Sequence, residues 1–134
     1  MTDRTIGNPL LDSAIFMAIT SKNEEAYADL LKAFAEACRQ RALVYVAGDE
    51  RQDSGKMEIR VMRGNTGKVW CCLTSDKHAE AMRGKVNCYA LPLDMIFRLA
   101  CEDGIDGIVF NPDKEPGLEI SLELIRDIVK STAG

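Results

Sequence analysis

Two adjacent cysteines, Cys71 and Cys72, carry the most conspicuous chemistry in this chain. They lie in the stretch VWCCLT, residues 69–74, whose β-branched and aromatic side chains predict a strand. Neighbouring strand residues point to opposite faces, so we expect one thiol in the core and the other nearer the surface. Neither cysteine belongs to the C-x-x-C spacing that redox and zinc sites use. We therefore interpret both as structural thiols.

The single histidine and three aspartates offer the next candidate chemistry. His78 falls in the first turn of a short helix predicted over residues 76–83, without a cysteine, serine or second histidine at a meaningful spacing. We expect it to face solvent. Asp103, Asp106 and Asp113 could attract a divalent cation, but an apolar strand interrupts them, and turns and capping explain them more simply. The sequence thus predicts no metal, no cofactor and no catalytic residue.

Polar residues at two strand ends are the candidate ligand-binding positions. Thr74 and Ser75 stand where a strand passes into a helix, and Asn111 follows the apolar run 107–110. Free N–H groups at such a junction can hold an anion, but no glycine-rich loop accompanies this one. Capping of the helix by Ser75 is the plainer interpretation. If both strands end at the same edge of a sheet, Thr74, Ser75 and Asn111 would meet there.

Two helices that open the chain must help to position these residues. Asn8 and Pro9 form a favourable helix start, because Asn can accept a bond from a free N–H and Pro has none to lose. Ser21 and Glu24 have the spacing of a capping box for the second helix. The apolar stripe of that helix consists of Tyr27, Leu30, Leu31, Phe34 and Cys38.

The middle of the chain predicts strands. Residues 43–46 read as a strand, and residues 47–56 as a polar connection. Apolar and polar side chains alternate over 57–62, as in a half-buried strand. The segment 63–68 has the glycine and asparagine content of a turn, and 69–74 would return as the second strand of an antiparallel hairpin.

The second half alternates strands and helices. A strand is predicted over 86–91, an amphipathic helix between Pro92 and Gly104, an inner strand over 107–110, and a last helix capped by Ser121. Helices and strands are mixed, and the hairpin guarantees an antiparallel pair. We therefore predict an α+β (mixed α/β) fold, with a single mixed sheet that contains an antiparallel hairpin and has helices packed on it.

Composition limits the classes of function. The chain has 134 residues, which suits one domain over 1–134, and a formal net charge of -4, which gives no basic field for nucleic acid. No apolar run is long enough to cross a membrane, and the N-terminus lacks the pattern of a secretory signal. Five cysteines at irregular spacing fit a reducing compartment, so we expect a cytoplasmic protein.

The ordered segments together resemble the SseB-like family, named for the N-terminal domain of the enhanced serine sensitivity protein. The resemblance rests on NPLLDSAI at 8–15, NEEAYADLLKAF at 23–34 and LPLDMIFRLACEDGIDGIVFNP at 91–112. It also rests on LTS at 73–75, where Leu73 replaces the aromatic residue typical of relatives. The resemblance implies a compact bacterial α/β domain and brings no established catalytic residues. Some relatives add a C-terminal domain, which we do not expect in a chain of this length.

These observations favour a non-enzymatic binding or regulatory module that acts through a protein partner. Trp70, Met62 and Tyr89 would form the partner surface if the outer side of the hairpin is open; otherwise helices cover it. The alternative is a small-ligand-binding protein or unrecognised enzyme with a polar site near Ser75 and Asn111. A homodimer formed through the hairpin or the last helix is a third hypothesis.

Overall fold

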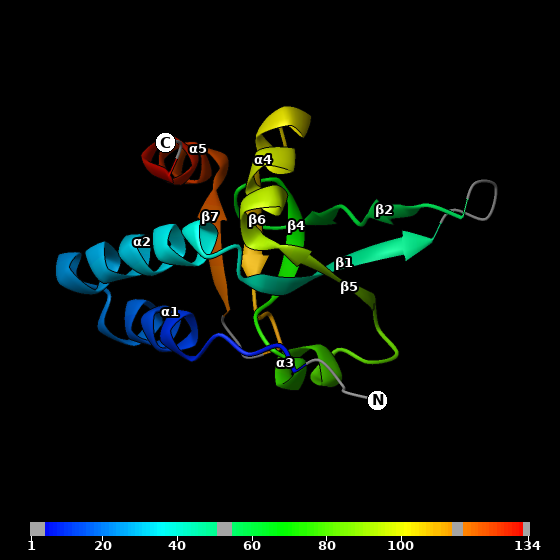
Figure 1. Ribbon diagram of the computed structural model, residues 1–134, viewed down its shortest axis with the longest axis horizontal. Coiled ribbons are helices and arrows are strands. Elements are labelled where there is room, and N and C mark those ends of the chain that lie inside the picture. Colours follow the sequence, from blue (N-terminus) through cyan, green and yellow to red (C-terminus); the bar gives the residue numbers. More distant parts are fainter. Residues whose placement is uncertain (1–4, 51–54, 114–116, 133–134) are drawn as a thin grey trace.

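The computed structural model describes residues 5–50, 55–113 and 117–132. Within these ranges the chain forms an α+β fold, with helices packed on both faces of one mixed sheet (Figure 1). The helices are α1 (Pro9–Ser21), α2 (Glu24–Arg39), α3 (Asp76–Ala81), α4 (Leu93–Asp103) and α5 (Leu122–Thr132). The strands are β1 (Leu43–Glu50), β2 (Met57–Ile59), β3 (Met62–Arg63), β4 (Lys68–Leu73), β5 (Asn87–Pro92), β6 (Gly107–Phe110) and β7 (Leu118–Ser121).

The sheet is mixed, as the sequence predicts. One edge of β1 pairs with β5, and its other edge pairs with β4 and β2, always antiparallel. On its far side β4 runs parallel to β6, which pairs antiparallel with β7. The carboxyl ends of β4 and β6 therefore meet, and this is the place where open α/β sheets commonly carry polar sites.

Two of the predicted strands differ from those of the structure by more than one residue. β1 continues to Glu50 instead of ending at residue 46, because β2 and β5 pair with its second half. Residues 51–54 of the predicted connection lie outside the described residues. The alternating run 57–62 is divided into β2 and β3, since β2 pairs with β1 whereas β3 turns to pair with β4. The hairpin predicted around 63–68 is present as the β3–β4 pair.

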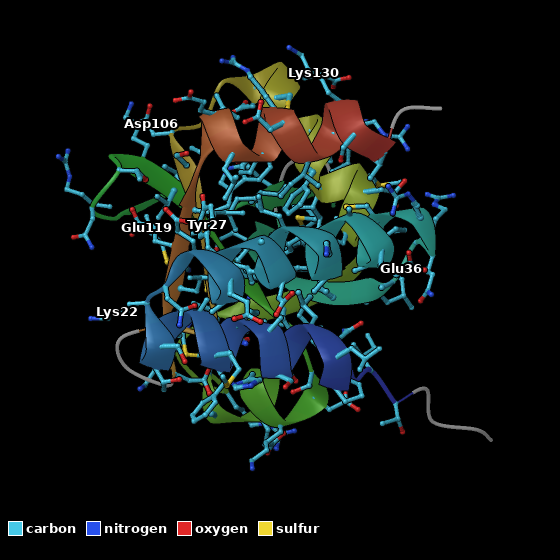
Figure 2. All side chains as sticks on the ribbon, turned by 90° about the vertical axis from the view of Figure 1, so that its left-hand side faces the viewer. Lys22, Tyr27, Glu36, Asp106, Glu119 and Lys130 are labelled. Carbon is cyan, nitrogen blue, oxygen red and sulfur yellow. The ribbon has the colours of Figure 1, made fainter. Side chains whose placement is uncertain are left out.

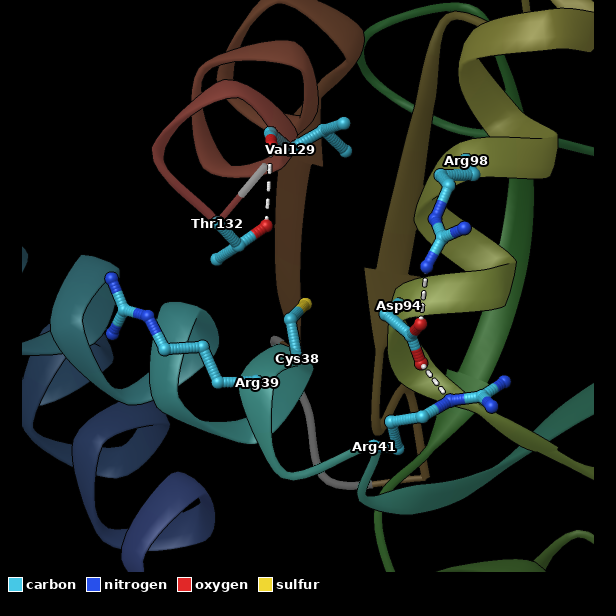
Figure 3. Close-up of a pocket in the computed structure, with 7 residues that line it drawn as sticks. All are labelled: Cys38, Arg39, Arg41, Asp94, Arg98, Val129 and Thr132. Atoms are coloured by element: carbon cyan, nitrogen blue, oxygen red, sulfur yellow. Dashed lines mark hydrogen bonds and ion pairs between the residues drawn. The ribbon is translucent and has the colours of Figure 1, made fainter. Parts of the chain in front are cut away.

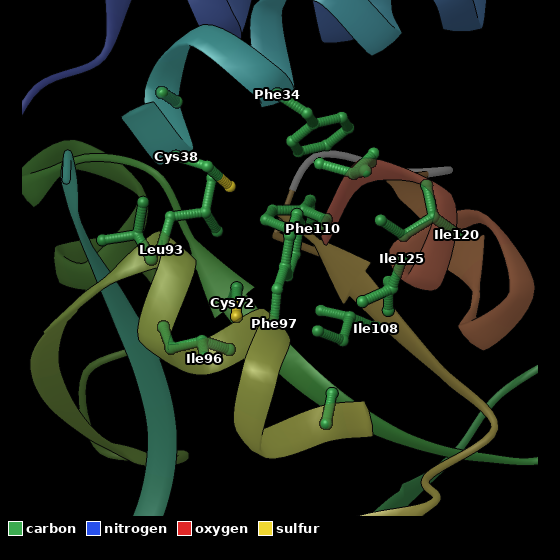
Figure 4. Packing of buried hydrophobic residues seen from close by; sticks show 14 of the residues in the cluster. Phe34, Cys38, Cys72, Leu93, Ile96, Phe97, Ile108, Phe110, Ile120 and Ile125 are labelled. Carbon is green, nitrogen blue, oxygen red and sulfur yellow. The ribbon is translucent and has the colours of Figure 1, made fainter. Parts of the chain in front are cut away.

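An aromatic cluster joins three elements on the face of the sheet covered by α2, α4 and α5 (Figure 4). The ring centroids of Phe34 and Phe110 are 5.0 Å apart, and those of Phe34 and Phe97 are 5.8 Å apart. All three side chains are fully buried. Close aromatic pairs of this kind stabilise a core beyond the area they bury.

A smaller cluster lies on the opposite face, where α3 covers Ala47, Cys71 and Leu73. Cys72 points to the first face, so the two adjacent thiols do point in opposite directions. Both are nevertheless fully buried. The expectation that one of them is more exposed is wrong, because helices lie on both sides of β4.

The N-termini of the helices confirm some of the predicted capping residues and contradict others. Ser75 caps α3 by accepting the His78 N–H, and Ser121 accepts the Leu124 N–H at the start of α5, as predicted. The capping box is wrong, since Ser21 is the last residue of α1. Asn23 caps α2 instead and accepts the Ala26 N–H at 2.8 Å.

The aromatic cluster generates a stability prediction. Replacing Phe34 with Ala should lower the free energy of unfolding by about 3–5 kcal/mol, because it leaves a cavity between two other buried rings. The matched control is Tyr27→Ala on the same helix, whose side chain is 48% exposed and which should cost about 0.5 kcal/mol or less. Urea denaturation measures both values. Equal losses for the two variants would contradict the assigned core.

Candidate functional site

The ends of β4 and β6 bring Thr74 and Asn111 into direct contact. The backbone N–H of Thr74 donates to Asn111 Oδ1 at 3.0 Å, and Asn111 Nδ2 donates to Thr74 Oγ1 at 3.0 Å. The backbone N–H of Asn111 in turn donates to the Cys72 carbonyl at 2.9 Å. Asn111 has a φ of +54°, a left-handed conformation that asparagine tolerates better than most residues. The sequence predicts this contact on the condition that both strands end at the same edge of the sheet, and the structure meets that condition.

The N-terminal segment completes this cluster. Thr74 Oγ1 donates to Asp12 on α1, and Asn8 Nδ2 donates to the carbonyls of Thr74 at 2.6 Å and Leu43 at 3.0 Å. Asn8 thus makes tertiary bonds and forms no side-chain cap for α1. We call Asn8, Asp12, Thr74 and Asn111 the strand-end network.

The polar groups of the strand-end network are directed at one another. Thr74 is fully buried and Asn111 is 4% exposed. The Thr74 hydroxyl donates to one side chain of the network and accepts from another, while its backbone N–H and carbonyl are also bonded. A ligand would have to replace these internal bonds, which are costly to break when buried. Ser75 stands next to the network, and its hydroxyl caps α3.

A largely buried histidine–aspartate pair adjoins the network, and sequence reasoning missed it. His78 Nδ1 lies 2.8 Å from Asp113 Oδ2, and their side chains are only 14% and 4% exposed. The expectation of a solvent-facing His78 is therefore wrong. Asp113 Oδ1 is buried, and it has no hydrogen-bond partner among the residues that the structure describes. The sequence hints at this pair through position: His78 and Asp113 each follow the end of a strand, and the two strands become neighbours in the sheet.

This pair does not form a catalytic triad with the nearby serine. Ser75 Oγ accepts a bond from the backbone N–H of His78 at 3.4 Å, so the serine serves as a helix cap. A nucleophilic serine instead needs its hydroxyl bonded to a ring nitrogen of the histidine. The His78 ring instead bonds to Asp113 through Nδ1.

Neither metal binding nor thiol chemistry finds support in the described residues. Over residues 5–50, 55–113 and 117–132, no group of three or more His, Cys, Asp or Glu side chains could hold a metal ion. Burial raises the pKa of the Cys71 thiol to about 12 and that of Cys72 well above its ordinary value. Both thiols are therefore protonated at neutral pH and poorly nucleophilic. Within the same ranges, no helix combines the length and apolarity that crossing a bilayer requires.

An arginine-lined cavity of about 460 Å³ lies where α2, α4 and α5 meet (Figure 3). Asp94 accepts the Arg41 Nε–H at 3.3 Å and the Arg98 Nη2–H at 2.7 Å. Both guanidinium groups thus already face a carboxylate, and an anionic ligand would compete with it. The Cys38 thiol also lines the cavity, and burial, followed by the nearby Asp94 charge, raises its pKa to about 12. It is no candidate nucleophile.

The three residues expected to form a partner surface do not form one. Trp70 is 4% exposed and belongs to the main core, so its assignment to an outer surface is wrong. Met62 is half-buried against the smaller cluster on the α3 side, whereas Tyr89 is half-buried on β5 and packs toward the main core. The interpretation that helices cover this part of the sheet is the correct one for Trp70.

A group of exposed apolar side chains lies elsewhere, on α1. We call the side of α1 that faces solvent the α1 outer face; its exposed residues include Leu10, Ser13, Phe16, Met17 and Thr20. Leu10 is 83% exposed, Phe16 64% and Met17 47%. The only charged residue within α1 is Asp12, which Thr74 bonds. Figure 2 shows α1 beside α2 on the outside of the molecule.

The strand-end network predicts a large cost for changing Asn111. Asn111→Ala should lower the free energy of unfolding by about 2–4 kcal/mol, because it removes side-chain hydrogen bonds and places Ala in the left-handed region. Asn111→Gly removes the same bonds but tolerates that φ, so it should cost about 1 kcal/mol less. Chemical denaturation of both variants separates the two contributions. A loss below about 0.5 kcal/mol for both would argue against the network.

Thiol burial predicts which cysteines react in the native chain. Cys88 and Cys101 are half-buried, whereas Cys38, Cys71 and Cys72 are buried. Titration with Ellman's reagent at pH 8 should label two thiols quickly and the remaining three only after denaturation. Cys88→Ser should reduce the fast class by one. Rapid labelling of Cys71 or Cys72 in the folded chain would contradict the two-sided cover of β4.

Comparison with known proteins places this fold in a family. No curated protein and no solved structure matches the chain. The SseB protein N-terminal domain matches residues 11–127, which include β1 to β7, α2, α3 and α4 in full and parts of α1 and α5. The match spans both β4 and β6, together with Asp12, Thr74 and Asn111. The chain therefore belongs to the family of the SseB protein N-terminal domain.

Proposed function

We propose that this domain is a non-enzymatic binding module that docks a protein partner through the α1 outer face. The observation that carries the proposal is the combination of Leu10, Phe16 and Met17, all strongly exposed, on one helix whose outer side has no charged residue. Ser13 and Thr20 supply hydroxyl groups on the same side. The partner would present an apolar, uncharged surface.

The packing of α1 explains why this surface is unusual. A surface helix normally buries one apolar stripe and turns charged residues to water. In α1 the buried stripe consists of Leu11 and Ile15, which join the core beside α2. The opposite side is apolar as well. Single exposed apolar side chains are ordinary, whereas a group of them on one face marks an interaction surface.

The chemistry of the face favours a protein over a membrane or nucleic acid. Helices that lie on membranes combine an apolar face with Lys and Arg on the polar one, and α1 contains neither. Nucleic acids require basic groups near the phosphates, and the chain carries a net charge of -4. The exposed ring of Phe16 is a suitable anchor, because aromatic side chains contribute much of the binding energy at interfaces.

The strand ends support the rival hypothesis, a small ligand or an unrecognised reaction, less well. Thr74 and Asn111 direct their side-chain polar groups at each other and at Asp12, and Ser75 caps a helix. Within the described part of the chain, the buried Asp113 Oδ1 has no hydrogen-bond partner, and this feature would favour a ligand. One such atom specifies no reaction.

Site-specific crosslinking in the native host tests the proposal. A photoreactive amino acid at Ser13 should form an adduct with another protein, and the same probe at exposed Lys77 on α3 should not form that adduct. Adding Phe16→Glu to the Ser13 probe should reduce the adduct at least about tenfold, because a carboxylate would be buried against an apolar surface.

Stability provides the control for this experiment. Since Phe16 is exposed, Phe16→Glu should change the free energy of unfolding by about 0.5 kcal/mol or less, and a loss of the adduct then reports on docking and not on folding. An adduct that persists unchanged in the Phe16→Glu chain, or no adduct at Ser13 at all, would refute docking through the α1 outer face.

A further inference from the structure

β5 is an edge strand of the sheet. It pairs with β1 over all six of its residues, from Asn87 opposite Gly48 to Pro92 opposite Leu43. Among the described residues no strand pairs with its other side. Figure 1 shows β5 running alongside β1.

The backbone groups that face outward from β5 follow from the hydrogen-bond pattern. Leu93 N–H donates to the Ala42 carbonyl at 2.8 Å, so this pair is bonded across the β1–β5 ladder. Bonded and non-bonded pairs alternate in an antiparallel ladder, so Leu91, Tyr89 and Asn87 face β1. The N–H and C=O groups of Cys88 and Ala90 therefore point away from the sheet.

The opposite side of β1 confirms this alternation. Ala47 is paired with Cys88, and its carbonyl accepts the Arg60 N–H on the β2 side at 3.0 Å. Ala47 thus directs its backbone groups away from Cys88. Pro92 occupies an outward-facing position of β5. Proline has no N–H to donate and is tolerated at such positions on a sheet edge.

The sequence of β5 lacks the usual protection of an edge. Natural edge strands are short, or carry charges that discourage pairing with another chain. β7, at the other edge of the sheet, has four residues and includes Glu119. β5 has six residues, NCYALP, and none is charged. Ala90 is exposed, and Cys88 and Tyr89 are half-buried.

We propose that β5 pairs antiparallel with β5 of a second copy of this chain, which would extend the sheet across a two-fold axis. The axis passes by Tyr89, so that Tyr89 faces its own equivalent in a non-bonded pair. Cys88 then exchanges backbone hydrogen bonds with Ala90 of the second copy, and Ala90 with the second Cys88. A strand without charges is suited to pair with itself, because no like charges meet across the axis.

The expected dimer is weak. The register supplies about four intermolecular backbone hydrogen bonds, and contact through one edge strand covers less area than stable interfaces do. Dimer formation should therefore depend on concentration. The contact lies on β5 and leaves the α1 outer face free, so this inference does not depend on the proposed function.

Oligomeric state tests the inference directly. Sedimentation equilibrium over a concentration series should show a monomer–dimer equilibrium for the unmodified chain. Ala90→Pro should raise the dimer dissociation constant at least about tenfold, because it removes the outward N–H while leaving the bonds to β1 in place. A monomer at every concentration up to about 1 mM, the weak limit of measurable affinity, would overturn the proposal. A dimer unaffected by Ala90→Pro would also overturn it.

Disulfide formation tests the register. In a Cys88→Ser, Cys101→Ser background, Tyr89→Cys should form an intermolecular disulfide on mild oxidation, because Cα atoms in a non-bonded pair lie about 4.5 Å apart. Ala90→Cys in the same background is the matched control, since position 90 faces position 88 of the second copy and should remain reduced. Equal crosslinking of the two variants would reject the register with Tyr89 on the axis.

Far-ultraviolet circular dichroism and thermal midpoints establish that each variant is folded. Should Ala90→Pro fail to fold, Ala90→Lys replaces it, because this exposed side chain would place a charge on the edge without altering the ladder to β1. Ala90→Lys is expected to weaken the dimer in the same direction. A dimer of unchanged affinity in that chain would overturn the proposal, whereas the crosslink at Ser13 would be unaffected.

Discussion

The parallel pairing of β4 and β6 depends on how the polar groups at the carboxyl ends of the two strands are hydrogen-bonded. Buried polar groups without partners are costly, and here the side chains of Thr74 and Asn111 satisfy each other and the backbone at the strand ends. Asp12 then accepts a bond from the Thr74 hydroxyl, and Asn8 donates to the carbonyl of Leu43 in β1 and to that of Thr74, just after β4. One small network therefore holds the N-terminal segment against the centre of the sheet. The left-handed conformation of Asn111 is part of this arrangement.

The position of α1 follows from the same contacts. Its charged residue, Asp12, bonds to Thr74 in the strand-end network. Leu11 and Ile15 pack in the core beside α2, and the remaining side of the helix faces water. A helix fixed in this way cannot turn to bury Leu10 or Phe16 without giving up the bonds of Asp12. The exposure of these apolar side chains is thus a consequence of tertiary structure. It is also the basis for proposing an interaction surface there.

Local signals in the sequence were sufficient where neighbouring residues decide the structure. Period-two alternation placed Cys71 and Cys72 on opposite faces, and Ser75, Ser121 and Gly104 end or begin helices as their types predict. The family resemblance and the mixed sheet were also predicted correctly.

The remaining features depend on partners distant in the chain. The second half of β1 is a strand because β2 and β5 pair with it, and Cys71 is buried because α3 covers it. His78 and Asp113 are 35 residues apart, and only the parallel register of β4 and β6 brings them together. All of these features depend on the order of the strands in the sheet, and hydrophobic periodicity does not reveal that order. For the same reason, Trp70 could not be assigned to the core or to the surface from alternation alone. Alternation gives the face of a strand but not what covers that face.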